Sequence, residues 1–223
     1  MTNKLFASID EAKQFLYSKF GKDESFDVCI KEIHVKDLPV LCVYISGLVD
    51  GMTLTVQLTP LYFNSEENAK DLIKDDDTYF DNVFNFYGKS EPKDRDEFLT
   101  GILSGQVGFI TEHGYCYVTE LRSYPGRQPD EPDNEKVIRG SRDGFAENIM
   151  LNTALIRRRI RSPELRFDLH KITTIGKTDI AIAYMNDLVN EKHLKWLKKR
   201  LQEIEHDGLT MADKSLEEWL FKQ

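Results

Sequence analysis

The sequence has few cysteines and no long apolar run. Its 223 residues include three cysteines, Cys29, Cys42 and Cys116, each in a strand-like segment, so we expect free thiols in a reducing compartment. The best apolar run, Val40–Ile45, is far shorter than the roughly 18 residues that cross a bilayer. The N-terminal residues also lack the apolar core of a signal peptide. These absences predict a soluble chain of intracellular type.

Motifs for nucleotide, metal or catalytic chemistry are missing as well. No phosphate-binding loop of the GxGxxG or GxxxxGK[ST] type occurs. His113 and Cys116 supply at most two of the four ligands that zinc usually takes, and the other histidines are scattered. The same pair lacks the third group of a catalytic triad, although an enzyme acting through Cys116 stays an alternative. We therefore expect no enzyme activity, no metal and no cofactor.

The charge balance is acidic. The chain has 38 Asp and Glu against 30 Lys and Arg, a net charge of −8, and as a whole repels nucleic acid. Its one basic run is Arg157-Arg158-Arg159-Ile160-Arg161. At about 100° per residue, Arg159 points away from Arg157 and Arg161, so the run forms no continuous basic stripe. We expect no nucleic-acid partner, and we expect this run to compensate the helix dipole and to pair with carboxylates.

Hydrophobic periodicity predicts an α/β fold of two small subdomains, each a mixed β-sheet flanked by helices. In residues 1–122 we expect a helix from Ser8 to Phe20, strands over 26–35 and 38–45, helices near 53–61 and 98–103, and a hairpin over 107–121. In residues 143–223 we expect a helix from Phe145 to Ile160, strands over 165–175 and 178–185, a helix over 190–205, and a last helix near 216–221. Residues 123–142, rich in proline and charge, form the predicted linker.

The two halves resemble each other in sequence. Val43–Asp50 matches Ala183–Asn190, 140 residues later, with an aromatic residue, a Leu-Val pair and a helix N-cap in register. Each segment closes a strand pair and opens a helix. We interpret this as two related units, although common turn chemistry also produces such an echo.

The segment that joins the halves has the most specific pattern. It reads Val-Ile-Arg-Gly-Ser-Arg-Asp-Gly-Phe over 137–145, and Leu-Ile-Arg-Arg-Arg-Ile follows over 155–160. This closely resembles the signature of the A subunit of spore germinant receptors, the GerA family of spore-forming bacteria. Ser141 stands where the family usually has proline, and Asp143 where it usually has glutamate. Weaker landmarks of the family lie at 44–50, 102–105 and 200–208.

The resemblance implies the N-terminal domain of a longer receptor subunit. The later part of that subunit would lie in the spore inner membrane, with this domain on the core side. Its partners would be a transporter-like B subunit and a lipoprotein C subunit. The trigger would be a small-molecule nutrient, such as an amino acid, a sugar or an ion. Self-association of the domain is a further expectation.

Charged residues at the junction of the two halves are the predicted coupling or ligand-binding site. Arginines there would bridge carboxylates on both sides and give a joint with two stable arrangements. The side chains that we expect to act are Glu131, Arg139, Arg142 and Glu147, with Arg157, Arg158 and Arg159 packed behind them. The alternatives are an ordered linker that only ties two domains, and a pure assembly domain that docks receptor subunits without ligand.

Overall fold

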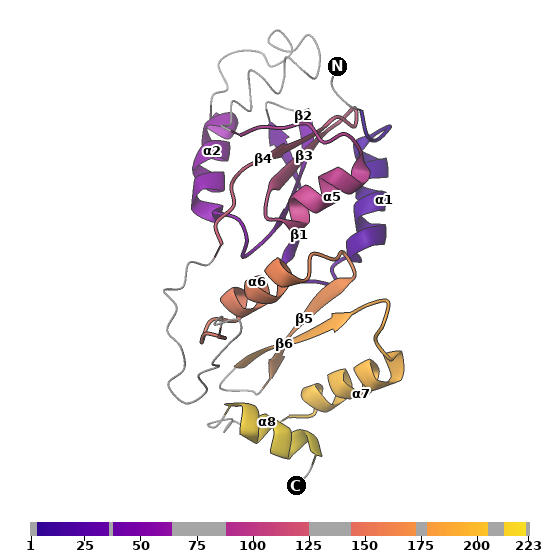
Figure 1. Ribbon diagram of the computed structural model, residues 1–223, viewed down its shortest axis with the longest axis vertical. Coiled ribbons are helices and arrows are strands. Elements are labelled where there is room, and N and C mark those ends of the chain that lie inside the picture. The colour runs from indigo at the N-terminus through magenta and orange to yellow at the C-terminus, as the bar shows by residue number, and fades with distance from the viewer. Residues whose placement is uncertain are drawn as a thin grey trace, which may run out of the picture.

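Two β-sheets with their helices follow one another along the long axis of the molecule (Figure 1). The structure is a computed structural model, which describes residues 4–35, 38–63, 88–124, 144–172, 178–204 and 212–221. The first unit contains α1 (Ile9–Phe20), β1 (Val28–Val35), β2 (Leu38–Ile45), α2 (Gly51–Phe63), α5 (Arg95–Leu103), β3 (Val107–Thr111) and β4 (Cys116–Thr119). The second contains α6 (Ile149–Arg159), β5 (Leu165–Ile172), β6 (Thr178–Met185), α7 (Glu191–Gln202) and α8 (Ala212–Phe221).

The first sheet is buried on both faces. Its order is β1-β2-β3-β4 with antiparallel pairing throughout, so β2 lies inside the sheet as its two-sided apolar pattern predicts. One face packs Leu41 and Val43 against Phe98 of α5 and residues of α1, and the other packs Val40 against Leu54 of α2. A Cβ at Gly108 would come within 2.6 Å of the Phe98 ring. Glycine therefore lets α5 approach the sheet closely.

The second sheet is smaller and more exposed. It consists of β5 and β6, paired antiparallel. Helices α7 and α8 contribute apolar residues to a core cluster around Ile172, Leu201 and Ile204. No residue of β6 is fully buried, in contrast to β2. An isolated strand pair has marginal stability, so this sheet depends on its helices and on the first unit.

The two similar sequence segments, 43–50 and 183–190, have similar local structures. In both units a strand hairpin is followed by a short turn and a capped helix. The Asp50 carboxylate accepts from the backbone N–H groups of Met52 and Thr53 at 3.0 Å, which starts α2. The Asn190 side chain accepts from the backbone N–H of Lys192 at 3.0 Å, which starts α7. Both predicted N-caps are confirmed.

Several expectations need adjustment. Both sheets are purely antiparallel rather than mixed. The helix expected from Phe145 begins at Ile149, because Asn148 caps it by accepting from Met150 N at 2.9 Å. Phe145 is 69% exposed and does not belong to the helix. Residues 125–143 lie outside the described residues, so the linker 123–142 and the domain limits 1–122 and 143–223 stay predictions.

Candidate functional site

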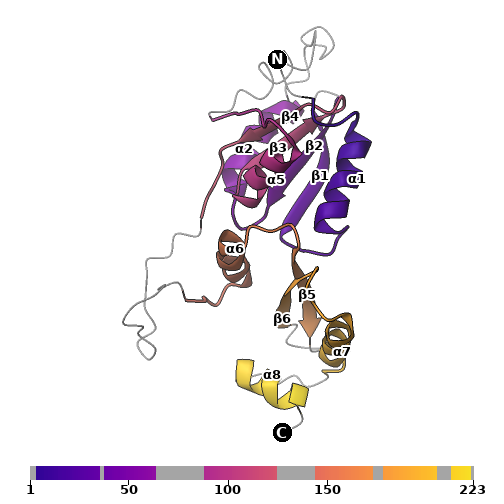
Figure 2. The same ribbon diagram turned by 45° about the vertical axis from the view of Figure 1, so that its right-hand side comes forward.

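Helix α6 lies between the two sheets and contacts both units (Figures 1 and 2). Its N-terminal half packs against the turn after β2, where a Cβ at Gly47 would come within 3.0 Å of the Ala154 Cβ. Ala154 is buried in the core cluster of the first unit. The C-terminal half of α6 carries the arginine run into the junction. The helix is thus part of the interface rather than an element of one unit only.

Arg157 forms the central contact of the junction. Its side chain is fully buried, and it binds the Asp27 carboxylate with two parallel hydrogen bonds, Nε to Oδ2 at 2.9 Å and Nη2 to Oδ1 at 3.1 Å. The same guanidinium donates to the backbone oxygens of Ser162 at 2.9 Å and Leu165 at 3.1 Å. This two-point geometry requires the planar fork of arginine. One side chain therefore holds α6, β5 and the loop before β1 together.

The loop before β1 completes this network from the first unit. Ser25 Oγ donates to Asp27 Oδ1 at 2.6 Å and accepts from the backbone N–H of Phe167 at 2.9 Å. The backbone N–H of Phe26 donates to Phe167 O at 3.0 Å, and the two phenyl rings pack edge to face at 6.3 Å. The Arg157 guanidinium lies 5.2 Å from the centre of the Phe167 ring. The start of β5 is thereby bonded to the first unit through backbone and side chains.

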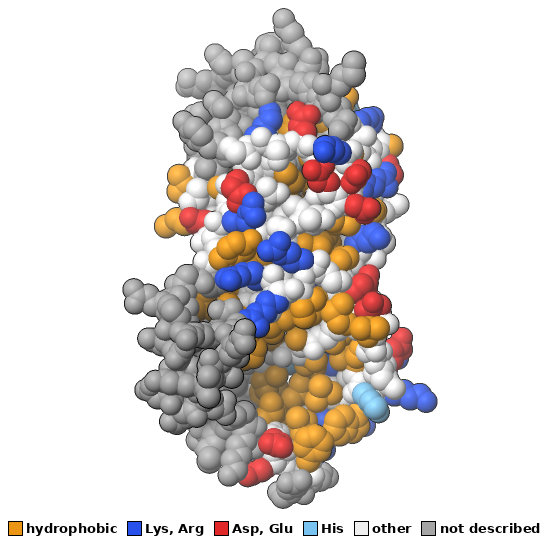
Figure 3. Space-filling view, in the orientation of Figure 1, with side chains coloured by type: hydrophobic (Ala, Val, Ile, Leu, Met, Phe, Trp, Pro, Cys, Tyr) orange, Lys and Arg blue, Asp and Glu red, His pale blue; other side chains and the backbone are white. Residues whose placement is uncertain are grey.

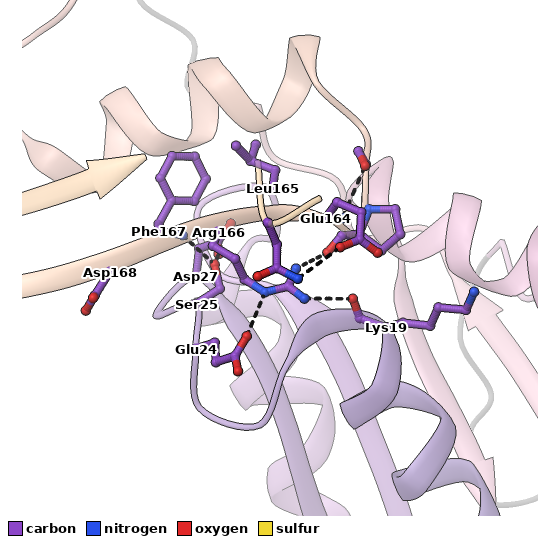
Figure 4. A network of polar contacts seen from close by, with 12 residues as sticks. Lys19, Glu24, Ser25, Asp27, Glu164, Leu165, Arg166, Phe167 and Asp168 are labelled. Atoms are coloured by element: carbon purple, nitrogen blue, oxygen red, sulfur yellow. Dashed lines mark hydrogen bonds and ion pairs between the residues drawn. The ribbon is translucent and has the colours of Figure 1, made fainter. Parts of the chain in front are cut away.

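Arg166 is a second buried arginine at the junction (Figure 4). From β5 it reaches the end of α1, where Nη2 donates to the backbone oxygen of Lys19 at 3.0 Å, and it pairs with Glu24 at 3.2 Å. It also donates to the backbone oxygen of Pro163 in its own unit. Because a cation near a helix C-terminus is favourable, Arg166 both caps α1 and joins the units.

The energetics of the junction follow from its burial. The Asp27 side chain is 3% exposed, and the Arg157 side chain has no exposed surface, so neither charge is solvated by water. Removing one partner of such a pair costs about 3–5 kcal/mol, because the other charge stays buried without compensation. The hydrogen-bond network thus favours one relative pose of the two units.

The predicted site residues fall into three groups. Arg157, which was expected to pack behind the other charged residues, lies at the centre of the junction and itself binds a carboxylate, that of Asp27. Arg158 is exposed with its guanidinium 5.4 Å from the Tyr124 ring of the first unit, while Arg159 and Glu147 are exposed. The other three predicted residues, Glu131, Arg139 and Arg142, lie outside the described residues.

The partners of Arg157 were not identified from the sequence. Asp27 and Ser25 precede β1 in a short polar loop that resembles any solvated turn, and they lie 130 and 132 residues from Arg157. The role of Arg166 could have been suspected from the sequence, because it lies between two apolar strand residues, Leu165 and Phe167. A charged side chain in such a strand needs either a buried partner or contact with solvent.

A cavity of about 320 Å³ adjoins the junction. It lies beside the end of α1 and β1, and Ser25 and Phe26 of the junction form part of its wall together with Tyr17, Val28 and Lys31. Its size is at the lower end of the range for small-molecule sites. A molecule bound there would touch the loop that carries Asp27.

The thiol chemistry left open by the sequence is not supported. Cys116 is buried, its Sγ contacts the backbone oxygen of Gly114 at 3.7 Å, and burial raises its pKa, whereas a nucleophilic thiol needs a lowered pKa. All three cysteines are free. Within the described ranges, no group of three or more His, Cys, Asp or Glu side chains is placed to hold a metal ion. None of the helices described is both long and apolar enough to cross a bilayer.

Comparisons with known proteins agree on the family. The family described as Bacillus/Clostridium GerA spore germination protein matches residues 14–223. Stage V sporulation protein AF of Bacillus subtilis (strain 168) is 36% identical over 95% of this chain and 43% of that protein. Spore germination protein KA of the same organism is 29% identical over 89% of this chain and 37% of that protein. The chain thus spans about two fifths of the length of these relatives.

A solved structure has the same fold. The N-terminal domain of the A subunit of the Bacillus megaterium spore germinant receptor GerK3 superposes with a TM-score of 0.68 over 95% of this chain and 78% of that chain, at 23% identity. The α/β fold with two helix-flanked sheets is therefore an observed architecture. The chain belongs to the GerA family of spore germination proteins.

Proposed function

We propose that this chain is the N-terminal domain of a germinant receptor A subunit and that it couples nutrient recognition to the membrane part of the receptor. The observation that supports this role is the buried Arg157–Asp27 pair, which joins two units through one residue of the family signature. A joint with this many directed contacts transmits a displacement of one unit to the other. The displacement is transmitted because sliding of one unit against the other would break several buried hydrogen bonds at once.

The loop over 24–27 is the proposed input of the coupling. Its residues Ser25 and Phe26 line the cavity of about 320 Å³ and bond to Phe167 of β5. A change in the cavity wall therefore reaches Asp27 through its hydrogen bond from Ser25 Oγ. The proposed output is the second unit, whose first strand is β5. Coupling in this form needs two arrangements of the joint, of which the observed one is the locked arrangement.

The remaining parts of the receptor are placed by the same proposal. The relatives are more than twice as long as this chain, which leaves room for a membrane region in the full polypeptide. We place that region in the spore inner membrane, this domain on the core side, and B and C subunits as its partners. A small-molecule nutrient would act on this domain directly or through another subunit.

The test is Arg157→Lys in the full-length gene at its own locus. Lysine keeps the charge but makes a single contact, so it loosens the joint without leaving Asp27 unpaired. We expect full abundance of the protein by immunoblot and a germination rate after nutrient addition at least severalfold lower. Germination by a nutrient-independent trigger should be unchanged.

The matched control is Arg158→Lys, an exposed position on the same helix, which should germinate at the normal rate. A normal rate for abundant Arg157→Lys protein would contradict the coupling role. Because one relative is named for sporulation and another for germination, spore yield should be measured beside germination. Charge reversal at Arg139 and Arg142 tests the predicted coupling residues outside the described ranges in the same assay.

A pure assembly role is the second candidate. It is favoured by the exposure of β6, which lies on the side of β5 away from the bonds that Phe167 makes to the first unit. In that case Arg157→Lys would reduce co-purification of the other subunits in proportion to germination. A normal complex with reduced germination would favour coupling instead.

A further inference from the structure

The solvent-facing side of α7 carries an exposed aromatic residue. Leu197 and Leu201 pack into the core cluster of the second unit. At about 100° per residue, Trp196 points away from these two leucines, and it is 48% exposed. A single exposed apolar side chain needs no partner by itself. The residues around Trp196 therefore decide whether this face binds something.

Three lysines surround Trp196. Lys192 lies four residues before it and Lys199 three residues after it, so both are its neighbours on the same face of the helix. Lys195 lies between these two lysines, about one turn from each, and all three are exposed. The exposed face of α7 thus combines one aromatic side chain with a cluster of positive charge.

The charges of these lysines remain accessible from outside. Lys195 pairs with Glu191 at 3.2 Å, but the two side chains are 78% and 80% exposed. Lys199 lies 3.9 Å from Glu203, and its side chain is 77% exposed. Exposed pairs of this kind contribute little to stability and are screened by salt, so they exchange readily for another anion. Among the described residues, Lys192 has no ion-pair partner.

Helices α7 and α8 lie at the end of the molecule that is remote from the first sheet (Figures 1 and 2). Arg200 joins them, because its Nη2 donates to the backbone oxygens of Trp219 and Leu220 at 3.1 and 3.2 Å. The next residue, Phe221, is 62% exposed. Figure 3 shows apolar side chains gathered over the second unit, in the lower half of the molecule. A surface that binds α7 would thus meet the second unit, with the first sheet pointing away from it.

We propose that the face of α7 formed by Lys192, Lys195, Trp196 and Lys199 binds the surface of a lipid bilayer that contains anionic headgroups. The indole ring is amphipathic and favours the boundary between headgroups and acyl chains. Lysines beside it are attracted to the negative surface potential of such a bilayer. With 12 residues, α7 is too short to span a membrane, so it would lie on the surface.

The charge distribution favours a bilayer over a protein as the partner. The chain has a net charge of −8, and α8 carries exposed glutamates at 217 and 218, so attraction to an anionic bilayer is confined to α7. This confinement would orient the domain with α7 toward the lipid. A stable protein interface needs a larger apolar centre than one tryptophan among lysines provides. A bilayer surface requires only an aromatic anchor and a basic face.

This contact rests on the proposed function in one respect, the presence of a membrane beside this domain. The proposed membrane region would follow α8, and α7 would then lie next to it. Binding through α7 would fix the orientation of the second unit relative to the bilayer. The coupling through Arg157 does not enter the argument, so the germination of Arg157→Lys spores and the vesicle experiments below succeed or fail separately.

The first test is co-sedimentation of this chain with vesicles of phosphatidylcholine, alone or with about one third phosphatidylglycerol. We expect binding to the anionic vesicles, little to the neutral ones, and release at high salt. Replacing Lys192, Lys195 and Lys199 by glutamate together should lower the affinity at least tenfold, because each lysine near an anionic surface contributes about fivefold. Circular dichroism checks that α7 remains folded.

The matched control replaces three exposed lysines of the first unit by glutamate, at positions 4, 22 and 93. It has the same net charge as the α7 variant but should bind anionic vesicles at least tenfold more tightly. Equal affinities of the two triple variants would overturn the proposal, because they would show that net charge alone decides the binding.

The second test uses the fluorescence of the two tryptophans, Trp196 and Trp219. Anionic vesicles should shift the emission to shorter wavelength, and Trp196→Phe should abolish this shift while it keeps most of the affinity. Trp196→Ala should lower the affinity severalfold, because the anchor is lost. A shift that persists in Trp196→Phe, or no binding of the chain to anionic vesicles, would overturn the proposal. Binding to soluble polyglutamate but not to anionic vesicles would do so as well, and would indicate an acidic protein partner.

Discussion

The two hairpins of the molecule share a local plan but differ in what surrounds them. The hairpin β1–β2 is extended by β3 and β4 and has helices on both faces, so β2 contains five residues that are at most 2% exposed. The hairpin β5–β6 receives no further strand in the described part of the chain, and no residue of β6 is buried. Similar local sequences therefore produce a buried strand in one unit and a partly exposed strand in the other.

The comparison indicates that the folded structure of the second unit depends in part on its contacts with the first unit. Its best-buried strand residues, Leu165, Arg166 and Phe167, lie where β5 meets the junction. Farther along β5, Leu169 is 37% exposed. Burial along β5 is thus high at the junction, falls in the middle of the strand, and is high again at Ile172, which packs with Leu201 and Ile204. The following predictions test how far the second unit depends on the junction.

The largest effect is expected for Arg157→Met. It leaves the Asp27 carboxylate buried without a positive charge beside it and should lower the free energy of unfolding by about 3–5 kcal/mol. Urea denaturation followed by circular dichroism measures the loss. Arg158→Met, on the exposed side of α6, should cost at most about 1 kcal/mol. Equal losses for the two variants would show that the junction is not the main support of the second unit.

A matched pair of core substitutions compares the sheets directly. Ile110→Ala, at a fully buried site in β3, should cost about 2–5 kcal/mol, because it removes buried methylenes and leaves a cavity. Ile182→Ala, at a half-buried site in β6, should cost about 1 kcal/mol. The same denaturation experiment measures both. A similar cost at both sites would mean that β6 is covered in solution.

Loss of an N-cap is expected to have a smaller effect. Asn190→Ala removes the acceptor for the first N–H groups of α7 and should cost about 1 kcal/mol. Asn190→Asp should restore most of that stability above the pKa of the new carboxyl group. Thermal denaturation of the three proteins gives the comparison. An unchanged melting temperature for Asn190→Ala would show that packing alone holds α7.

The smallest effect concerns the pH dependence of the two caps. Hydrogen bonds from the Thr53 hydroxyl and from the Thr53 and Met52 backbone lower the pKa of Asp50, so its contribution to stability is present above the unfolded pKa near 3.9. That contribution is lost as pH falls through the lower folded pKa. Asp50→Asn should reduce the acid sensitivity of α2, measured by amide exchange between pH 5 and pH 3. The Asn190 cap of α7 should show no such dependence.

The helix caps and the hairpin turn were predicted well, because each depends on residues that are close in the sequence. The Ser8 cap of α1, the turn at Gly114 and the Asp50 and Asn190 caps follow from side-chain chemistry within a few residues. The start of α6 was placed too early because Phe145 fits the helical period but faces solvent. Asn148, three residues on, provides the cap that decides the start.

The sequence by itself determined the hairpins, the helices, the acidic charge and the family signature, since each depends on short-range periodicity or a contiguous pattern. Only the tertiary structure decided which arginine of the basic run is buried and paired, because burial depends on what packs around a side chain. Arg157 and Arg158 are adjacent in sequence, yet one is enclosed with Asp27 and the other is exposed beside Tyr124. The tertiary structure likewise decided that the first unit covers the outer edge of β5.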